Sequence, residues 1–107
     1  MNENAVGERT LGCALKVHRT LGPGLLESVY EACLAYELDR AGLAYARQLA
    51  MPGRYEDIQL DVGYRLDLVV DGIVVVEIKA VERLADVHRA QLLSYLRLGG
   101  YKLGYLL

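Results

Sequence analysis

The sequence lacks the long apolar run and the basic leader that mark membrane and exported proteins. No window approaches the roughly 18 apolar residues that cross a bilayer. The longest apolar stretches, at residues 68–70 and 73–76, are strand-length pieces separated by Asp71-Gly72. The first four residues, Met-Asn-Glu-Asn, contain no basic residue and no apolar segment, so no export signal is visible. We therefore expect a cytoplasmic protein without a membrane partner.

Cysteine is scarce, and its placement argues against disulfides and zinc. Cys13 and Cys33 both fall within helical patterns, without CxxC spacing and without a histidine at ligand distance. We expect both to be small buried hydrophobic residues in a reducing compartment. A redox role or a zinc site has almost no support.

The chain also lacks the basic excess typical of proteins that bind nucleic acid. Its formal net charge is −2, from 12 Lys and Arg against 14 Asp and Glu. Three of those acids are candidate metal ligands, and without them the balance is 12 − 11 = +1. The charge is therefore compatible with phosphate substrates but does not predict them. Tight DNA binding would need a partner or a second subunit.

Length and composition indicate one folded domain over residues 1–107. This length is enough for a single core, although it is near the lower end for a domain. Hydrophobic residues make up 53% of the chain, which argues against disorder. No linker, repeat or low-complexity segment divides the sequence.

Periodicity predicts the element order α-α-β-β-β-α-β. Helical patterns cover about residues 3–20, 24–41 and 84–98, and strand patterns cover 43–55, 58–70, 73–79 and 101–107. The first helix stops at Leu21-Gly22-Pro23-Gly24, because proline lacks the amide that a continuing helix needs. A β-meander, a crossover helix and one more strand make a mixed four-stranded sheet flanked by helices, which is an α/β fold.

Charged residues on two neighbouring predicted strands give the strongest chemical signal. Asp67 is followed, after nine residues, by Glu77-Ile78-Lys79. Because side chains alternate along a strand, Glu77 and Lys79 should emerge on one face while Val76 and Ile78 pack on the other. Charges near a core are costly unless they are paired or bound to metal. A Glu–Lys pair at a solvated strand end would explain this local pattern equally well.

The turn at Asp71-Gly72 decides whether the two carboxylates can share an ion. A two-residue loop would set Asp67 opposite Val76 and leave Glu77 on the other face. A three-residue loop over 70–72, with its glycine left-handed in a bulge, turns both carboxylates the same way, offset by one diagonal step. A shared metal site therefore requires the three-residue loop.

Two such carboxylates would form a hard oxygen site. Together with the Ile78 carbonyl, Asp67 and Glu77 suit Mg²⁺ or Mn²⁺. Lys79 lies two residues from a ligand and on its face, where it can polarise the attacking water and stabilise charge on a phosphate. If the charges serve only solubility at a sheet edge, Asp67 and Glu77 should lie far apart or on opposite faces.

Longer runs of the sequence resemble a known family. The matching runs are VHRTLGPGLLESVYE at 17–31, DVGYRLD at 61–67, VEIKAVE at 76–82 and QLLSYL at 91–96. Gly24, Glu27 and Tyr30 fit the signature of the GxxExxY proteins, a family grouped with the PD-(D/E)XK nuclease superfamily. The resemblance covers nearly the whole chain and implies a restriction-endonuclease-like αβββαβ core. The superfamily also contains inactive members.

The resemblance also implies roles for residues on the helices. Nucleases similar to RecB and lambda exonuclease carry an acidic residue or histidine on the helix before the sheet. Glu27 fits that position as a further metal ligand, or else it is a solvated first-turn glutamate that favours the helix dipole. The Gln-x-x-x-Tyr motif of those nucleases is matched by Gln91 and Tyr95, whose i, i+4 spacing puts both on one face to bind phosphate and support the site.

Four more polar residues stand near these positions. Arg65 lies two residues before the strand aspartate, on its face, and can meet phosphate or form a surface ion pair. His18 precedes the Gly-Pro-Gly turn and can approach the helix-borne glutamate, and His88 lies one turn before the Gln-x-x-x-Tyr motif. A structural or surface role suits each histidine better than a catalytic one. Tyr30 is expected in the core, with its hydroxyl tied to the site.

These observations imply a nuclease that uses Mg²⁺, or Mn²⁺, to hydrolyse phosphodiester bonds of nucleic acid, DNA ahead of RNA. The alternative is an inactive module on the same scaffold that binds nucleic acid or protein, which the acidic composition favours. Because the chain ends within an apolar segment, we also expect an open sheet edge that favours a homodimer or a larger complex.

Overall fold

The computed structural model describes residues 2–22, 26–79 and 85–107. The elements are α1 (Glu3–Leu21), α2 (Glu27–Arg40), β1 (Tyr45–Tyr55), β2 (Ile58–Val70), β3 (Val74–Glu77), α3 (Asp86–Gly99) and β4 (Leu103–Leu106). The predicted order is confirmed, and most boundaries agree within a few residues. Residues 23–25, which belong to the predicted turn and to the start of the predicted second helix, lie outside the described residues. Residue 84, the predicted start of the third helix, does too.

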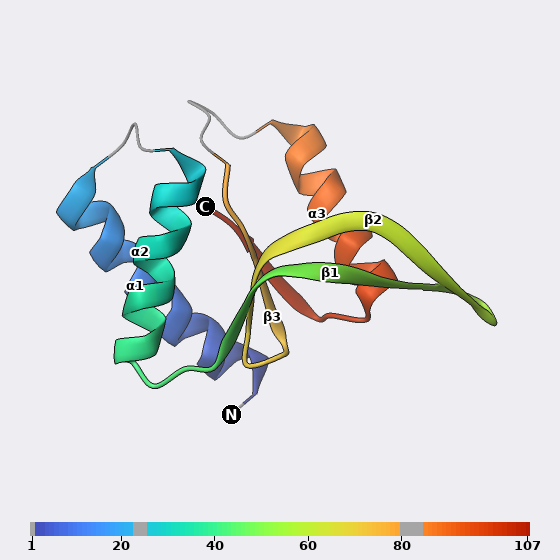
Figure 1. Ribbon diagram of the computed structural model, residues 1–107, viewed down its shortest axis with the longest axis horizontal. Coiled ribbons are helices and arrows are strands. Elements are labelled where there is room, and N and C mark those ends of the chain that lie inside the picture. The colour runs from blue at the N-terminus through green and yellow to red at the C-terminus, as the bar shows by residue number, and fades with distance from the viewer. Residues whose placement is uncertain (1, 23–25, 80–84) are drawn as a thin grey trace.

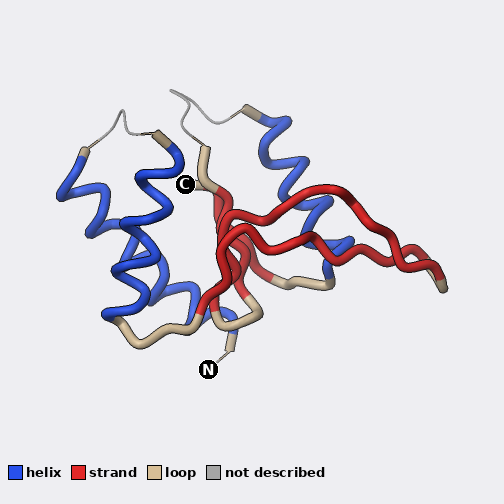
Figure 2. Tube along the Cα trace, viewed as in Figure 1, coloured by secondary structure: helices blue, strands red, loops and turns tan. Residues whose placement is uncertain are grey.

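The strands form one mixed sheet between two layers of helices (Figure 1). The strand order is β1-β2-β3-β4, with antiparallel pairing between the first three strands and parallel pairing between β3 and β4. Parallel neighbours need a crossover, and α3 lies between them in sequence. Helices α1 and α2 cover one face of the sheet and α3 covers the other (Figure 2).

The first helix has a defined start and stop. The Asn2 side chain accepts a hydrogen bond of 2.9 Å from the Ala5 amide, which satisfies one of the free donors of the first turn. Gly22 adopts a left-handed φ of 72°, and its amide donates to the His18 carbonyl at 2.8 Å. Glycine is suited to this place because it takes a positive φ without steric cost.

Two apolar clusters lie on opposite faces of the sheet. The cluster under α1 and α2 includes Val6, Val17, Leu34, Leu38, Leu68, Val70, Val74, Val76 and Ile78. The cluster under α3 includes Met51, Leu66, Val69, Val75 and Leu92. Strand β3 is therefore buried on both faces, which is why it reads as a continuous apolar run. Val76 and Ile78 pack under α1 and α2, as the alternation predicts.

Truncation in the first cluster should be costly. Leu68 is fully buried, so Leu68→Ala should lower the free energy of unfolding by about 2–5 kcal/mol. Urea denaturation followed by circular dichroism measures this change. The matched control is Leu15→Ala on the outer side of α1, where the side chain is 52% exposed and a change below about 1 kcal/mol is expected. Equal losses in the two variants would contradict the assigned core.

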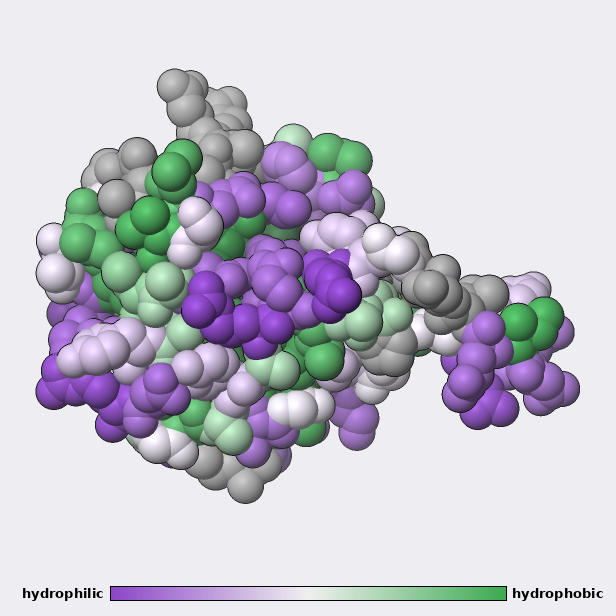
Figure 3. Space-filling view, viewed as in Figure 1, coloured by the Kyte–Doolittle hydropathy of each residue, from purple (hydrophilic) through white to green (hydrophobic). Residues whose placement is uncertain are grey.

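The hairpin of β1 and β2 extends beyond the rest of the sheet as a long arm (Figure 1). Its tip is polar in the space-filling view (Figure 3), although Tyr55 and Ile58 at the tip are also exposed. The candidate site lies at the other end of this hairpin, where β2 meets β3. Among the described residues, no helix is long and apolar enough to cross a membrane.

Candidate active site

The turn between β2 and β3 sets the register of the candidate metal ligands. Pairing ends with Val70 opposite Val74, so the loop is the three-residue segment 71–73. Asp71 and Gly72 are both left-handed, with φ of 53° and 70°, and the Ile73 amide donates to the Val70 carbonyl at 3.1 Å. The three-residue length and the left-handed glycine that a shared metal site requires are both present. The predicted position, 70–72, is wrong by one residue because Asp71 also takes the left-handed conformation and leaves Val70 in the ladder.

This register brings the two strand carboxylates together. The pairing ends with Leu68 opposite Val76, so Asp67 and Glu77 are the next residues on the two strands. The Asp67 carboxylate lies close enough to raise the pKa of Glu77. This proximity argues against the solubility interpretation in which the two acids lie far apart.

Glu77 is a buried acid at the end of β3. It is 2% exposed, and its Oε2 accepts a hydrogen bond of 3.2 Å from the Tyr64 hydroxyl. Its Oε1 accepts no hydrogen bond from the described residues when the carboxyl is ionised, whereas the protonated carboxyl can donate to Asp67. Burial first, and the neighbouring Asp67 second, raise the pKa of Glu77 to about 8, against the opposing effects of Tyr64 and Lys79. A buried carboxyl oxygen without a partner is costly, and a cation or a water would satisfy it.

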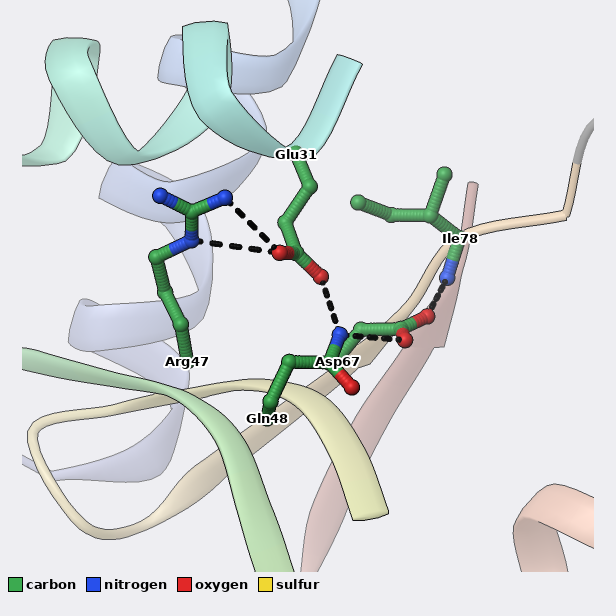
Figure 4. Close-up of polar contacts among 5 residues, drawn as sticks. All are labelled: Glu31, Arg47, Gln48, Asp67 and Ile78. Atoms are coloured by element: carbon green, nitrogen blue, oxygen red, sulfur yellow. Dashed lines mark hydrogen bonds and ion pairs between the residues drawn. The ribbon is translucent and has the colours of Figure 1, made fainter. Parts of the chain in front are cut away.

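Asp67 accepts hydrogen bonds at both carboxylate oxygens (Figure 4). The Ile78 amide donates to Oδ2 at 2.8 Å, and the Gln48 side chain donates to Oδ1 at 3.2 Å. The Ile78 amide thus donates to the Asp67 side chain instead of to a backbone carbonyl of β2, so the backbone pairing of β2 and β3 does not continue past Glu77. Strand β3 therefore ends earlier than the predicted boundary at residue 79, and it ends at the site.

The Ile78 carbonyl is the predicted backbone ligand, and the surrounding hydrogen bonds indicate its direction. On the β4 side, the Glu77 carbonyl accepts from the Leu107 amide at 3.0 Å, and the Lys79 amide donates to the Leu107 carbonyl at 3.0 Å. The Ile78 amide instead donates to Asp67 on the β2 side. In an extended chain the N–H and C=O of one residue point to the same edge. We therefore expect the Ile78 carbonyl on the Asp67 side.

A shallow pocket lies between strands β2, β3 and β4, the residues just after β3, and helix α3. Its lining residues are Tyr64, Glu77, Lys79, His88, Gln91, Leu92, Tyr95 and Leu106. The predicted sharing of one face by Glu77 and Lys79 is confirmed, because both line this pocket. Gln91 and Tyr95 reach the same pocket from α3, and Tyr95 stacks on Tyr64 with ring centres 4.5 Å apart. The pocket thus joins Glu77 and Lys79 to the Gln-x-x-x-Tyr motif, while Asp67 is not among its lining residues.

His88 has a structural role at the start of α3. Its Nδ1 accepts a hydrogen bond of 3.0 Å from the Ala85 amide, and its own amide donates to the Ala85 carbonyl at 3.0 Å. This reciprocal pair caps the first turn of the helix. An imidazole that accepts at Nδ1 carries its proton on Nε2 when it is neutral.

The structure does not bring Glu27 into a metal-binding cluster. Glu27 is exposed at the first residue of α2. Across residues 2–22, 26–79 and 85–107, no three His, Cys, Asp or Glu side chains form a group that could hold an ion. The assembled pair is Asp67 with Glu77, and Glu27 as third ligand stays a prediction. Gly24, which precedes it in the signature, lies outside the described residues.

Three other predicted residues lie away from the paired carboxylates. Tyr30 donates its hydroxyl to the Ala14 carbonyl at 3.1 Å and so joins α2 to α1, which corrects the expected tie to the site. Burial raises the pKa of this phenol. His18 is exposed near the end of α1. Arg65 is exposed on β2 and donates to the Gln48 carbonyl at 2.9 Å, so its predicted contact with phosphate remains to be tested.

Sequence reasoning missed the helix residue that reaches the site. Glu31 on α2 is 6% exposed, and its Oε2 accepts from the Arg47 Nε and Nη2 at 3.1 and 3.0 Å. Its Oε1 accepts from the Gln48 amide at 2.7 Å. Because Glu31 lies four residues after Glu27, the two share a helix face, and this spacing was the available signal. Nothing in the sequence marks Gln48.

Comparison with known families agrees with this architecture. The model of the PD-(D/E)XK nuclease superfamily matches residues 4–107. No curated protein and no solved structure matches the chain. Since the family match spans nearly the whole sequence, the chain belongs to the PD-(D/E)XK nuclease superfamily. Its α/β architecture, with three helices around a mixed four-stranded sheet, is consistent with that fold.

Glu77 should make the metal-free protein less stable as the pH rises. Its pKa is raised from 4.5 to about 8, so the folded state keeps a proton that the unfolded state releases. The contribution of Glu77 to the free energy of unfolding is fully present below a pH of about 4.5, the pKa in the unfolded chain. It is lost as the pH rises through about 8, the pKa in the folded protein. We expect a loss of roughly 2–4 kcal/mol across this range, measured by urea denaturation in EDTA. Glu77→Gln should flatten the profile, whereas Glu56→Gln at the exposed hairpin tip should not; parallel profiles for all three proteins would refute the assignment.

Proposed function

We propose that this protein is a metal-dependent nuclease that hydrolyses phosphodiester bonds of DNA or RNA, with Mg²⁺ or Mn²⁺ as its cofactor. The observation that supports it best is the surroundings of Glu77. Its buried carboxyl has one oxygen without a partner among the described residues, lies beside Asp67, and shares a pocket with Lys79. Burial of the Glu77 carboxyl without chemical use would cost stability.

The donor set fits a hard divalent cation. Asp67 and Glu77 supply carboxylate oxygens, the Ile78 carbonyl would add a neutral oxygen, and such ligands suit Mg²⁺ and Mn²⁺. Glu27 would complete the set from the helix. When bound, the cation would supply Lewis-acid activation of water and neutralise charge on the phosphate.

The protein's own groups divide the remaining tasks in this proposal. Hydrolysis forms a bond from a water oxygen to phosphorus and breaks the bond to the leaving sugar oxygen. Lys79 would stabilise the negative charge that gathers on the phosphate oxygens and hold the attacking water. Gln91 would donate a hydrogen bond to a phosphate oxygen, while the stacked Tyr64 and Tyr95 would form the wall that fixes Glu77.

We further propose membership of the GxxExxY group within the superfamily. Gly24, Glu27 and Tyr30 support it by their spacing, as do the runs around the strand motif and the Gln-x-x-x-Tyr motif. The expected substrate is nucleic acid, DNA ahead of RNA. Arg65, exposed on β2 two residues before Asp67, is the candidate contact to a neighbouring phosphate.

A second candidate function is a non-catalytic module that binds nucleic acid or protein. The net charge of −2 favours it, as does the lack of a three-acid group among the described residues. In that case Asp67→Ala and Glu77→Ala would leave the affinity for nucleic acid unchanged. A degenerate module has no chemical reason to retain Asp67, Glu77 and Lys79 together.

Cleavage assays separate the two candidates. Purified protein is incubated with labelled single- and double-stranded DNA and RNA in Mg²⁺, in Mn²⁺ and in EDTA. The nuclease proposal predicts cleavage of at least one substrate with a metal and none in EDTA. Retarded but intact substrate in every condition, without metal binding by calorimetry, would replace it with the binding module.

A further inference from the structure

We propose that Glu31 and Gln48 are positioning residues that hold Asp67 in the orientation a metal ligand needs. This inference rests on the proposed function, because it assigns two further residues to the same site. It joins α2 to the strand motif through a continuous series of hydrogen bonds, drawn in Figure 4. Neither residue touches the reacting atoms in this scheme.

The series begins at a buried carboxylate with a fixed direction. Glu31 is 6% exposed, and a buried charge is costly unless it is paired. Arg47 binds Oε2 through two nitrogens, at 3.1 and 3.0 Å, and so neutralises the charge from one side. The other oxygen, Oε1, is thereby directed at Gln48, 2.7 Å away. The Glu31–Arg47 ion pair therefore orients the Gln48 amide near the site without adding net charge there.

Gln48 links this carboxylate to the site. Its amide nitrogen donates to Glu31 Oε1 at 2.7 Å and to Asp67 Oδ1 at 3.2 Å. An amide nitrogen has two hydrogens and both partners are pure acceptors, so the network determines which end of the amide faces the two acids. The amide oxygen in that place would repel both carboxylates.

The backbone at Gln48 is strained to place this amide. Its φ of 52° is left-handed, although glutamine is not a residue that adopts this conformation readily. For an L-residue the left-handed region is sterically unfavourable, and such strain persists where the surroundings determine it. Arg65 donates to the Gln48 carbonyl at 2.9 Å and helps to hold the strained backbone.

The result at Asp67 is a carboxylate held at both oxygens. Gln48 holds Oδ1 and the Ile78 amide holds Oδ2, at 3.2 and 2.8 Å. Each oxygen keeps a further lone pair, so the two bonds fix the carboxylate without exhausting it. Groups that orient a metal ligand in this way typically contribute 10–100-fold to metal affinity.

The test is Mn²⁺ affinity, measured by electron paramagnetic resonance on the folded protein. Gln48→Met removes both donors at similar length and should weaken binding by roughly 10–100-fold. Glu31→Gln should have a similar effect, and the double variant should be no worse than the weaker single variant, because the pair acts as a unit. The matched control is Glu37→Gln, on the same helix as Glu31, which breaks the ion pair with Lys16 of α1 and should leave Mn²⁺ affinity unchanged.

A second measurement does not depend on metal. Hydrogen exchange of the Ile78 amide reports its bond to Asp67, so Gln48→Met should accelerate this exchange in EDTA while the amides of β3 remain protected. Wild-type protein that binds no Mn²⁺ would overturn the proposed function. Wild-type binding with unchanged affinity and Ile78 exchange in Gln48→Met would overturn the positioning role alone. Loss of the fold in both single variants would also overturn it, because the pair would then be structural.

Discussion

Replacing Lys79 with methionine should reduce phosphodiester hydrolysis by at least roughly 10²–10³-fold while the fold survives. Lys79 lines the pocket beside Glu77 but has no lone pair to offer a cation when it is charged. Its loss should therefore lower kcat and leave Mn²⁺ affinity within a few-fold of the wild-type value. Single-turnover cleavage of a labelled oligonucleotide measures the first quantity and calorimetry the second.

The matched control for Lys79 is Lys102→Met. Lys102 is exposed between α3 and β4, so this variant makes the same change of charge outside the pocket. It should retain nearly full activity. Equal losses in the two variants would indicate general attraction of nucleic acid, and full activity in Lys79→Met would remove Lys79 from the catalytic group.

Asp67→Asn should weaken Mg²⁺ and Mn²⁺ binding by more than about 100-fold and abolish cleavage. The asparagine keeps the shape of the side chain but removes one of the paired charges that a hard cation requires. The pKa of Glu77 should also fall, because the Asp67 carboxylate is a cause of its elevation. Metal titration measures the affinity, and carboxyl ¹³C chemical shifts follow the titration of Glu77.

Asp57→Asn serves as the control for Asp67. Asp57 is exposed at the tip of the β1–β2 arm, far along the hairpin from the strand motif, so its substitution should change neither metal affinity nor the pKa of Glu77. If Asp67→Asn bound metal as tightly as the wild-type protein, the two carboxylates would not share an ion.

Much of the fold could be predicted because its signals are local. The period of apolar residues defined three helices, and the uninterrupted run at 73–76 defined a strand buried on both faces. The end of α1 at Gly22 was predictable because glycine takes a positive φ without steric cost. These features depend on near neighbours in sequence, so one chain is enough to read them.

The register of the β2–β3 hairpin shows where local reasoning reaches its limit. The turn residues left a two-residue and a three-residue loop open, and the structure has the three-residue loop that a shared metal site requires. The exact start of the loop depends on Asp71, whose left-handed φ of 53° keeps Val70 paired. The Asp71 amide also donates to the Ala44 carbonyl at 2.7 Å. A contact that distant in sequence is not visible in the turn itself.

The candidate site was predictable where it lies on strands and less so where elements meet. Alternation was enough to place Glu77 and Lys79 together, and helical spacing placed Gln91 with Tyr95. Glu31, Gln48 and Tyr64 enter through contacts between distant segments, and their roles depend on side-chain directions that no spacing rule supplies. The positive φ of Gln48 breaks the local preference of its residue type, as functional sites often do.

A metal-soaked crystal tests the central claim most directly, since that claim is that Asp67 and Glu77 converge on one divalent cation. Anomalous scattering from a crystal soaked in MnCl₂ should give one strong peak about 2.0–2.4 Å from a carboxylate oxygen of each residue. The formerly unpartnered oxygen of Glu77 should be among the ligands. Absence of such a peak at saturating Mn²⁺, or a peak elsewhere with Glu77 still unpartnered, would contradict the account.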